Sequence, residues 1–135
     1  MIKRGNNKKK KGFTLIELII VLAVMAIIAL IAIPNFAAVR ENSKVKADKQ
    51  SCETIERTIL MLVSDETIVG AGTVTYNTGG KSVVPDGVKT KGGDAAAAKI
   101  VIDKALTKVE NPQITTNTKY NIVITDADVV VTTTN

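Results

Sequence analysis

The strongest pattern along the chain is an apolar run near the N-terminus, followed by a segment whose apolar and charged positions repeat with a helical period. Residues 13–33 are 21 consecutive positions, and only Thr14 and Glu17 among them are not apolar. At about 1.5 Å per residue, a helix of this length spans roughly 31 Å, enough to cross the hydrocarbon core of a bilayer. The run therefore predicts a membrane-spanning helical segment, and Pro34 lies at the end of the apolar run.

One carboxylate interrupts this run. A charged side chain near the middle of a membrane helix costs about 2.5–3.5 kcal/mol, so we expect a partner that compensates for the charge of Glu17. A plain membrane anchor would match the length of the run but would give Glu17 no role. A secretory signal peptide would have a shorter apolar core, about 7–15 residues, followed by a small-residue cleavage site.

The chain continues from residue 35 to about residue 64 without glycine or proline, in the pattern of an amphipathic helix. Apolar positions three, four or seven residues apart form one face, and charged positions form the other. The apolar face comprises Val45, Cys52, Ile55, Ile59 and Leu62, and the charged face comprises Arg40, Glu41, Lys44, Lys46, Lys49, Glu53, Glu56 and Arg57. Pro34 removes one backbone hydrogen bond and predicts a kink between the two halves. We expect one long helix, residues 13 to about 64, membrane-spanning over 13–34 and amphipathic over 35–65.

Beyond Val69 the chain becomes rich in glycine, which marks turns and loops. Residues 73–76 alternate with a period of two and predict a short strand. Asp94 is a candidate N-cap for a helix from Ala95 to about Val109, because its side chain can accept from free amides of the first turn. The residues expected along one side of this helix are Ala98, Ile102, Ala105, Leu106 and Val109.

Two segments near the C-terminus, residues 119–125 and 128–134, are rich in β-branched residues and predict strands joined by a hairpin at Asp126-Ala127. The threonine-rich residues 115–118 and 132–134 are expected to be exposed strand surface. The predicted fold class is α+β. A globular head, residues 66–135, would hold a short helix and a small antiparallel sheet of three or four strands, packed on the amphipathic half of the long helix.

The net charge of +5 comes from the N-terminus. Lys3, Arg4 and Lys8–Lys11 are six of the 18 basic residues, so 12 remain against 13 acidic residues in the rest of the chain. This distribution argues against a built-in basic face for nucleic acid, so no specific nucleic-acid partner is expected. By the positive-inside rule, it predicts that the N-terminus stays on the cytoplasmic side of a membrane.

The residue types that most often carry out catalysis are scarce. The chain has no histidine, no tryptophan and one cysteine, Cys52, which we interpret as a packed apolar residue of the helix. Asp126 and Asp128 lack further oxygen donors at calcium-site spacing, and Asp65-Glu66 is expected to be a solvated helix end. We therefore predict no catalytic residues, no metal site and no cofactor. A single cysteine also excludes an intramolecular disulfide.

The segment KKKKGFTLIELIIVLAVMAIIALIAIP, residues 8–34, resembles the N-terminus of a type IV pilin or a close relative. The resemblance implies that residues 1–12 form a basic leader removed by a prepilin peptidase after Gly12, and that the new N-terminal residue, Phe13, is N-methylated. It also implies that Glu17 neutralises the N-terminal ammonium of a neighbouring copy during filament assembly. The region around Pro34 is implied to be a flexible joint.

The same resemblance implies the partners and the location of the chain. The expected partners are further copies in a helical filament, the prepilin peptidase, an inner-membrane platform protein and a cytoplasmic assembly ATPase. The precursor would lie in the cytoplasmic membrane, and the assembled form in an extracellular pilus that serves adhesion, twitching motility or aggregation. Two alternatives stay open: a pseudopilin of a type II secretion or DNA-uptake system, and an anchored binding module that never polymerises.

Overall fold

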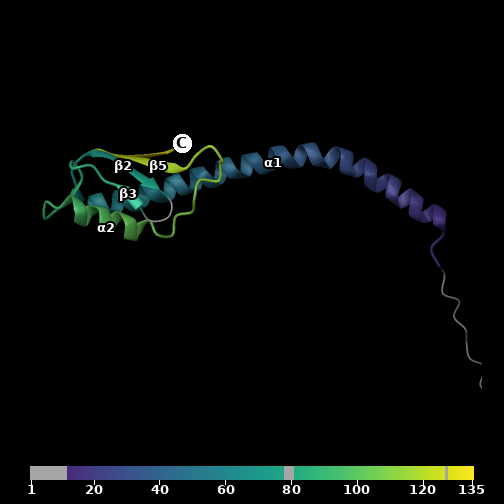
Figure 1. Ribbon diagram of the computed structural model, residues 1–135, viewed down its shortest axis with the longest axis horizontal. Helices are drawn as coiled ribbons and strands as arrows, with labels where there is room; N and C mark the ends of the chain where they lie inside the picture. The colour runs from purple at the N-terminus through teal and green to yellow at the C-terminus, as the bar shows by residue number, and fades with distance from the viewer. Residues whose placement is uncertain (1–11, 78–80, 127) are drawn as a thin grey trace, which may run out of the picture. The chain divides into compact units, whose positions relative to one another are not determined.

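The computed structural model describes residues 12–77, 81–126 and 128–135 (Figure 1). Residues 1–11 of the predicted leader and the predicted hairpin residue Ala127 lie outside these ranges. The elements, in chain order, are α1 (Leu15–Ser64), β1 (Ile68–Val69), β2 (Gly72–Asn77), β3 (Lys81–Val83), β4 (Lys89–Thr90), α2 (Ala95–Ala105), β5 (Lys119–Ile124) and β6 (Val129–Thr134). The α+β prediction is confirmed.

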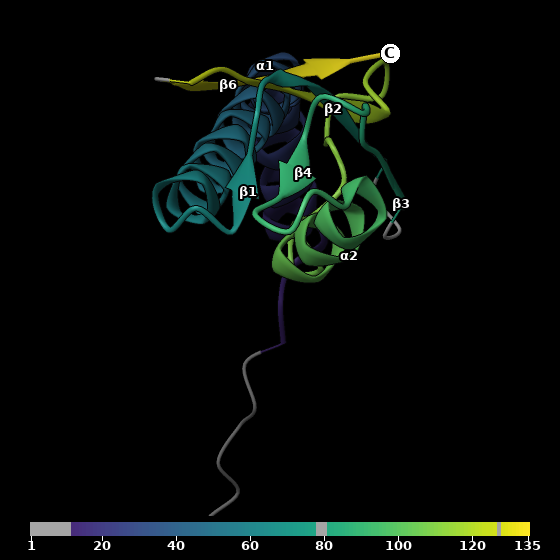
Figure 2. The same cartoon turned by 90° about the vertical axis from the view of Figure 1, so that its left-hand side faces the viewer.

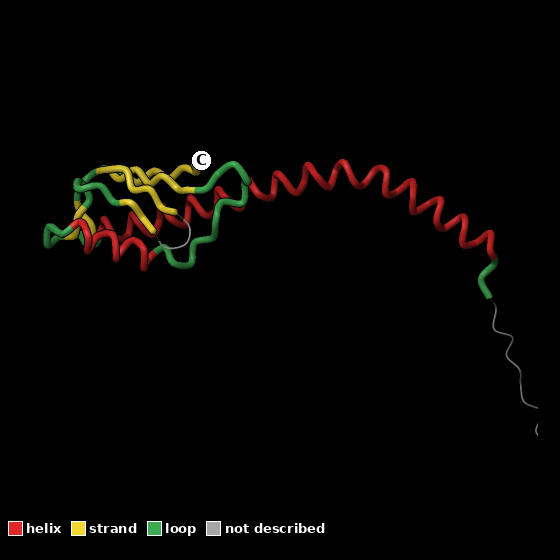
Figure 3. Tube along the Cα trace, in the orientation of Figure 1, coloured by secondary structure: helices red, strands yellow, loops and turns green. Residues whose placement is uncertain are grey.

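The chain divides into two compact units, Met1–Val39 and Arg40–Asn135, and α1 contributes residues to both. In the first unit, the described residues after Thr14 are all helical and all exposed. The second unit holds the rest of α1 together with α2 and every strand. Figure 3 shows the two helices in red and the strands in yellow.

The larger sheet has four strands in the order β3-β2-β5-β6, and all neighbouring strands are antiparallel. In the register of the last pair, Lys119 lies opposite Thr134 and Ile124 opposite Val129, which confirms the C-terminal hairpin. Helix α2 and the second-unit part of α1 lie on the same face of this sheet (Figure 2). A second, two-stranded sheet pairs β1 with β4.

The hydrophobic core lies between the four-stranded sheet and the two helices. It is composed of Ile55 and Ile59 from α1, Ile102 and Leu106 from α2 and its C-terminal end, and Ile68, Val74, Tyr76, Val88, Tyr120, Ile122, Ile124, Val129 and Val131. Burial of each large aliphatic side chain contributes about 1.5–3 kcal/mol. The two tyrosines also fix the sheet to the connection between α2 and β5. The Tyr76 hydroxyl donates to the Leu106 carbonyl and the Tyr120 hydroxyl to the Glu110 carbonyl, both at 2.9 Å.

Glycine allows a close approach between β1 and the loop before β4. Gly70 has φ +93°, and a Cβ atom added there would lie 2.1 Å from the Gly87 carbonyl oxygen. Because only glycine fits this position without strain, the small β1–β4 sheet depends on it.

Several predicted boundaries were wrong in detail. The long helix begins at Leu15 rather than Phe13, and α2 ends at Ala105 rather than Val109. Ala105 is exposed, although it was expected on the packed side of α2. Residues 115–118 form a turn and loop instead of a strand. The Asp94 cap is confirmed, since its carboxylate accepts from the Ala96 amide at 2.8 Å.

Asp103 joins the edge strand β3 to α2. Its carboxylate accepts from the Ser82 backbone N–H at 2.9 Å and from Lys99 Nζ at 2.6 Å. Partial burial alone would raise the pKa of the Asp103 carboxyl, but the hydrogen bonds from Lys99 and Ser82 outweigh it and lower the pKa below its ordinary value of 3.8.

Asp103→Asn is expected to reduce the free energy of unfolding at neutral pH and to matter progressively less in acid. The folded-state pKa is lowered, so the stabilisation by Asp103 is present above the unfolded-state pKa and is lost as the pH falls through the folded-state value. Urea unfolding of the solubilised chain at neutral and at acidic pH measures this difference. A difference that does not change with pH would contradict the ionic role of Asp103.

Candidate functional site

The residues predicted for processing and assembly, Gly12, Phe13 and Glu17, lie close together in sequence at the start of α1. Gly12 and Phe13 precede the helix, Thr14 is the residue before its first turn, and Glu17 lies within that turn. The Glu17 backbone N–H approaches the Thr14 carbonyl at 3.1 Å and the Thr14 hydroxyl at 3.4 Å. A hydroxyl residue followed three positions later by glutamate is the capping-box pattern, which explains why the helix starts here.

The Glu17 carboxylate is exposed, and within residues 12–77, 81–126 and 128–135 no basic side chain forms an ion pair with it. The Thr14 hydroxyl donates to Oε2 of this carboxylate at 3.5 Å. Among the described residues, the ion pairs are Lys44–Glu41, Lys91–Glu66 and Lys99–Asp103, and none of them involves Glu17. The helix N-terminus offers partial positive charge, but a full counter-charge would have to come from a group outside residues 12–77, 81–126 and 128–135.

The space next to this carboxylate is open. Gly12, Phe13, Thr14 and Glu17 line a recess of about 460 Å³. The Phe13 side chain is 82% exposed. The arrangement therefore presents one acid and one aromatic ring to whatever covers the start of α1.

The helix that follows has the properties of a membrane span. Within the part of the chain that the structure describes, α1 is the one helix long and apolar enough to cross a membrane, and its most apolar window is entirely exposed.

Pro34 lies inside α1 and does not end it. Because proline has no N–H, the Leu30 carbonyl lacks its usual helical donor. The Asn35 side chain donates to the next carbonyl, that of Ile31, at 3.4 Å.

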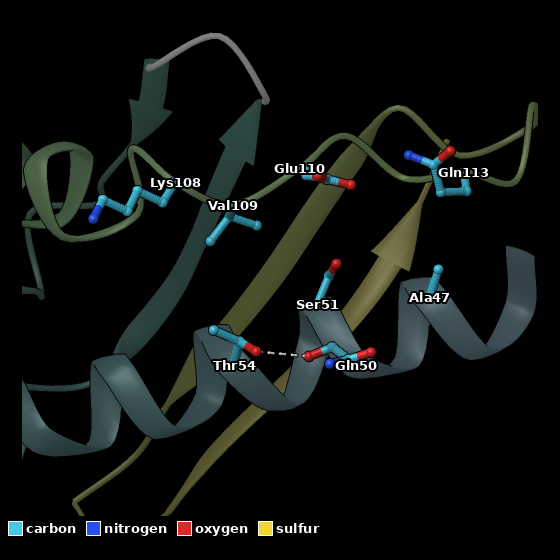
Figure 4. Close-up of a pocket in the computed structure, with 8 residues that line it drawn as sticks. All are labelled: Ala47, Gln50, Ser51, Thr54, Lys108, Val109, Glu110 and Gln113. Carbon is cyan, nitrogen blue, oxygen red and sulfur yellow. Dashed lines mark hydrogen bonds between the residues drawn. The ribbon is translucent and has the colours of Figure 1, made fainter.

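The second unit has a shallow groove on its surface. Figure 4 shows the groove, of about 350 Å³, between α1 and the α2–β5 connection. Its lining is polar and is made of Ala47, Gln50, Ser51, Thr54, Lys108, Val109, Glu110 and Gln113. Among the described residues, no group of three or more His, Cys, Asp or Glu side chains could hold a metal ion.

Cys52 is half-buried, and this burial, more than the nearby Asp48 and Glu56, raises the pKa of its thiol.

Asp48 is a residue that sequence reasoning missed. Its side chain is buried, at 4% exposure, and its two carboxylate oxygens accept from the backbone amides of Gln113 and Ile114. This contact fixes the α2–β5 connection on α1. The signal was present in the sequence, since Asp48 lies three residues after Val45 and four before Cys52, within the predicted apolar face.

Asp48→Ala is expected to reduce the free energy of unfolding by about 2–5 kcal/mol, because the two part-buried backbone amides of Gln113 and Ile114 would lose a charged acceptor. Glu53→Ala is the matched control, since it removes an exposed carboxylate from the same helix and should change stability little. Urea unfolding of both variants measures the effect. Equal midpoints for the two variants would show that Asp48 does not hold the connection in place.

Comparison with known proteins identifies the N-terminal segment. Residues 7–33 match the family described as the prokaryotic N-terminal methylation motif. The chain is also similar to the prepilin peptidase-dependent protein A of Clostridium perfringens (strain 13 / Type A), with 45% identity over 64 residues. That alignment covers 47% of this chain and 46% of the relative, so the chain spans about half the length of the curated relative that it matches. No solved structure matches the chain.

The resemblance to type IV pilins and their relatives is thereby confirmed for the N-terminal segment. The motif and the similar protein support a chain of the pilin or pseudopilin type. The motif and the apolar helix together fit a membrane-anchored precursor.

Proposed function

We propose that this chain, which carries the N-terminal methylation motif of pilin-like proteins, is a structural subunit of a type IV pilus. The single observation that carries the proposal is Glu17, a carboxylate within an apolar helix that forms no ion pair with any of the described residues and lies shortly after the proposed cleavage point. Residues 1–12 are the leader, and cleavage after Gly12 leaves Phe13 as the new N-terminal residue.

Cleavage supplies the missing counter-charge. It creates an ammonium group on Phe13, only four residues from Glu17. An isolated charge in an apolar environment is costly, and two opposite charges compensate each other when hydrogen-bonding geometry is good. In the proposed filament, the Phe13 ammonium of one copy lies against the Glu17 carboxylate of its neighbour.

The charge pair also determines how neighbouring helices are aligned. An apolar surface tolerates sliding, whereas one buried polar contact fixes register, as it does in coiled coils. The exposed apolar side chains of residues 15–33 stay covered throughout, first by lipid and then by the same segment of other copies. Residues 13–34 thus act as membrane span and filament core, 35–65 as the amphipathic continuation and 66–135 as the outer head.

Transfer from lipid to filament requires energy from other proteins. In our proposal the prepilin peptidase removes the leader, and a cytoplasmic ATPase acts with an inner-membrane platform protein to extract each subunit. The assembled chain then lies on the cell surface as an extracellular filament for adhesion, twitching motility or aggregation.

A pseudopilin of a secretion or DNA-uptake system would share the N-terminal motif, and it differs from a pilus subunit in where the protein accumulates. Cells are sheared, and the released material is examined by electron microscopy and immunoblotting for this chain. Long fibres that contain the chain support the pilus proposal. Recovery of the chain exclusively in the membrane fraction contradicts it and favours the pseudopilin or an anchored module.

A further inference from the structure

The C-terminal strand β6 is an edge of the four-stranded sheet, and no described strand pairs with its outer side. In the order β3-β2-β5-β6, β6 pairs with β5 on one side, and within the described residues no strand follows it on the other. Figure 2 shows β6 at one margin of the sheet and β3 at the opposite margin. An unpaired edge exposes backbone donors and acceptors that can pair with another extended chain.

The register identifies which residues present these groups. The Thr125 N–H donates to the Asp128 carbonyl at 2.9 Å, so this carbonyl points toward β5. Val130, Thr132 and Thr134 lie two, four and six residues after Asp128, so their backbone groups also point toward β5. Because hydrogen-bonding direction alternates along an antiparallel strand, Val129, Val131 and Thr133 turn their N–H and C=O groups toward the free edge. The Asp128 side chain accepts from the Val129 N–H at 2.9 Å. The backbone groups available for pairing at this edge are therefore mainly the N–H and C=O groups of Val131 and Thr133.

This edge lacks the features that usually prevent pairing between copies. Protected edge strands carry lysine, proline or a bulge. Val129–Thr134 is Val-Val-Val-Thr-Thr-Thr, six β-branched residues with no charge and no proline, and its pairing with β5 is regular. A short, uncharged run of high β-propensity is the type of segment that pairs with its own copies.

The surface next to the edge is open and partly apolar. A groove of about 340 Å³ runs between β6 and α1. Its lining includes Val131, Thr132 and Thr133 from β6 and Val45 and Cys52 from α1. Val45 is 49% exposed although it lies on the predicted apolar face of the helix. A strand added beside β6 would cover this surface.

We propose that β6 is an interaction surface that binds the β6 strand of a second copy of this chain. The occupant is a second copy because its β6 strand has the length, the β-propensity and the free hydrogen-bonding groups that this edge requires, and no charge on either strand opposes the contact. The strands pair antiparallel, as the rest of the sheet does, with Val131 of one copy opposite Thr133 of the other. Thr132 then lies opposite Thr132 of the second copy.

The symmetry of this contact decides which copies it joins. Two identical antiparallel strands are related by a two-fold axis, so the two α1 helices run in opposite directions. Neighbours within one polar filament have parallel α1 helices, so β6 pairing joins copies from separate filaments. This last step rests on the proposed function, whereas the pairing itself does not require Phe13 or Glu17.

A cysteine at the symmetric position tests the pairing and its register. In a Cys52→Ser background, Thr132→Cys places two thiols on facing residues with Cα atoms about 4.5 Å apart, within the range that a disulfide bridges, about 4.4–6.8 Å. The control is Val83→Cys, an exposed position on the opposite edge strand β3. The full-length chain is oxidised mildly in detergent. We expect a disulfide-linked dimer from Thr132→Cys and no such dimer from Val83→Cys. Equal dimer yields from the two variants would overturn the proposal.

Charge substitution provides a second test that also detects misfolding. Thr132→Lys and Thr132→Glu each place like charges opposite one another, so each variant alone should lose association between solubilised chains, while an equal mixture should recover it. Recovery shows that both variants are folded and pair through this strand. A mixture that associates no better than either variant alone contradicts the pairing. Both measurements use solubilised chains, so their outcome is independent of whether Glu17 directs filament assembly.

Discussion

Glu17→Ala is expected to abolish surface filaments while the precursor still inserts into the membrane and is still cleaved. Removal of the carboxylate leaves the Phe13 ammonium of each neighbour unpaired in an apolar environment, at a cost of about 3–5 kcal/mol for each interface. Insertion should improve slightly, because the helix loses a charge that lipid disfavours. Electron microscopy of sheared cells measures filament number, and immunoblotting of membranes measures the processed chain.

Glu41→Ala is the control for this experiment. Glu41 is an exposed carboxylate of the same helix, and it pairs with Lys44 at 3.4 Å on the surface, where an ion pair contributes little. Its removal should leave filaments at the wild-type level. Wild-type filament numbers from Glu17→Ala would refute charge pairing as the basis of assembly, whatever the control shows.

Gly12→Val is expected to leave full-length precursor in the membrane and to prevent filament formation. The substitution adds a branched side chain directly before the proposed scissile bond, where the peptidase must approach the backbone. A Cβ atom at Gly12 meets no atom within 4 Å, so the substitution does not disturb the packing of the chain. Mass spectrometry of the membrane-bound protein distinguishes a chain that begins at Met1 from one that begins at Phe13.

Gly5→Val is the matched control, since it makes the same change in the same leader, seven positions earlier. Processing of this variant should continue at the wild-type rate. Normal trimming of Gly12→Val, with Phe13 at the new N-terminus, would contradict the requirement for glycine at the cleavage site.

The elements of the fold that could be predicted from the sequence are those with a long or regular hydrophobic pattern. Helix α1 and the β5–β6 hairpin have such patterns, and β2 (Gly72–Asn77) extends the predicted strand 73–76 by one residue at each end. The β1–β4 sheet could not be predicted, because each strand has two residues and their pairing depends on the close approach of Gly70 to Gly87. Such a contact is determined by tertiary structure and leaves no periodicity.

The face of α1 was predicted only in part, for a physical reason. Ile55 and Ile59 are buried as expected, whereas Val45 is exposed and Asp48, which lies seven residues before Ile55, is buried. A helical pattern shows which side of a helix is apolar, but it does not show where along the helix the head begins to cover it. Nor does it show that a carboxylate on that side has two backbone amides to bind.

The candidate assembly site could be located from the sequence, because a carboxylate in an apolar run is conspicuous whatever the fold. The structure adds that Thr14 lies directly before the helix and accepts from the Glu17 backbone N–H in its first turn. It also adds that Glu17 forms no ion pair among the described residues. The proposed partner could not be found in one chain, because in our account it belongs to another copy and exists only after cleavage.

The most direct test of the central claim is the cryo-electron-microscopy structure of filaments sheared from cells that express this chain. The account predicts that each subunit begins at Phe13 and that its N-terminal nitrogen lies within ion-pair distance, about 4 Å, of the Glu17 carboxylate of an adjacent subunit. Subunits that retain Met1, or a Glu17 carboxylate with no N-terminal nitrogen beside it, would contradict the account.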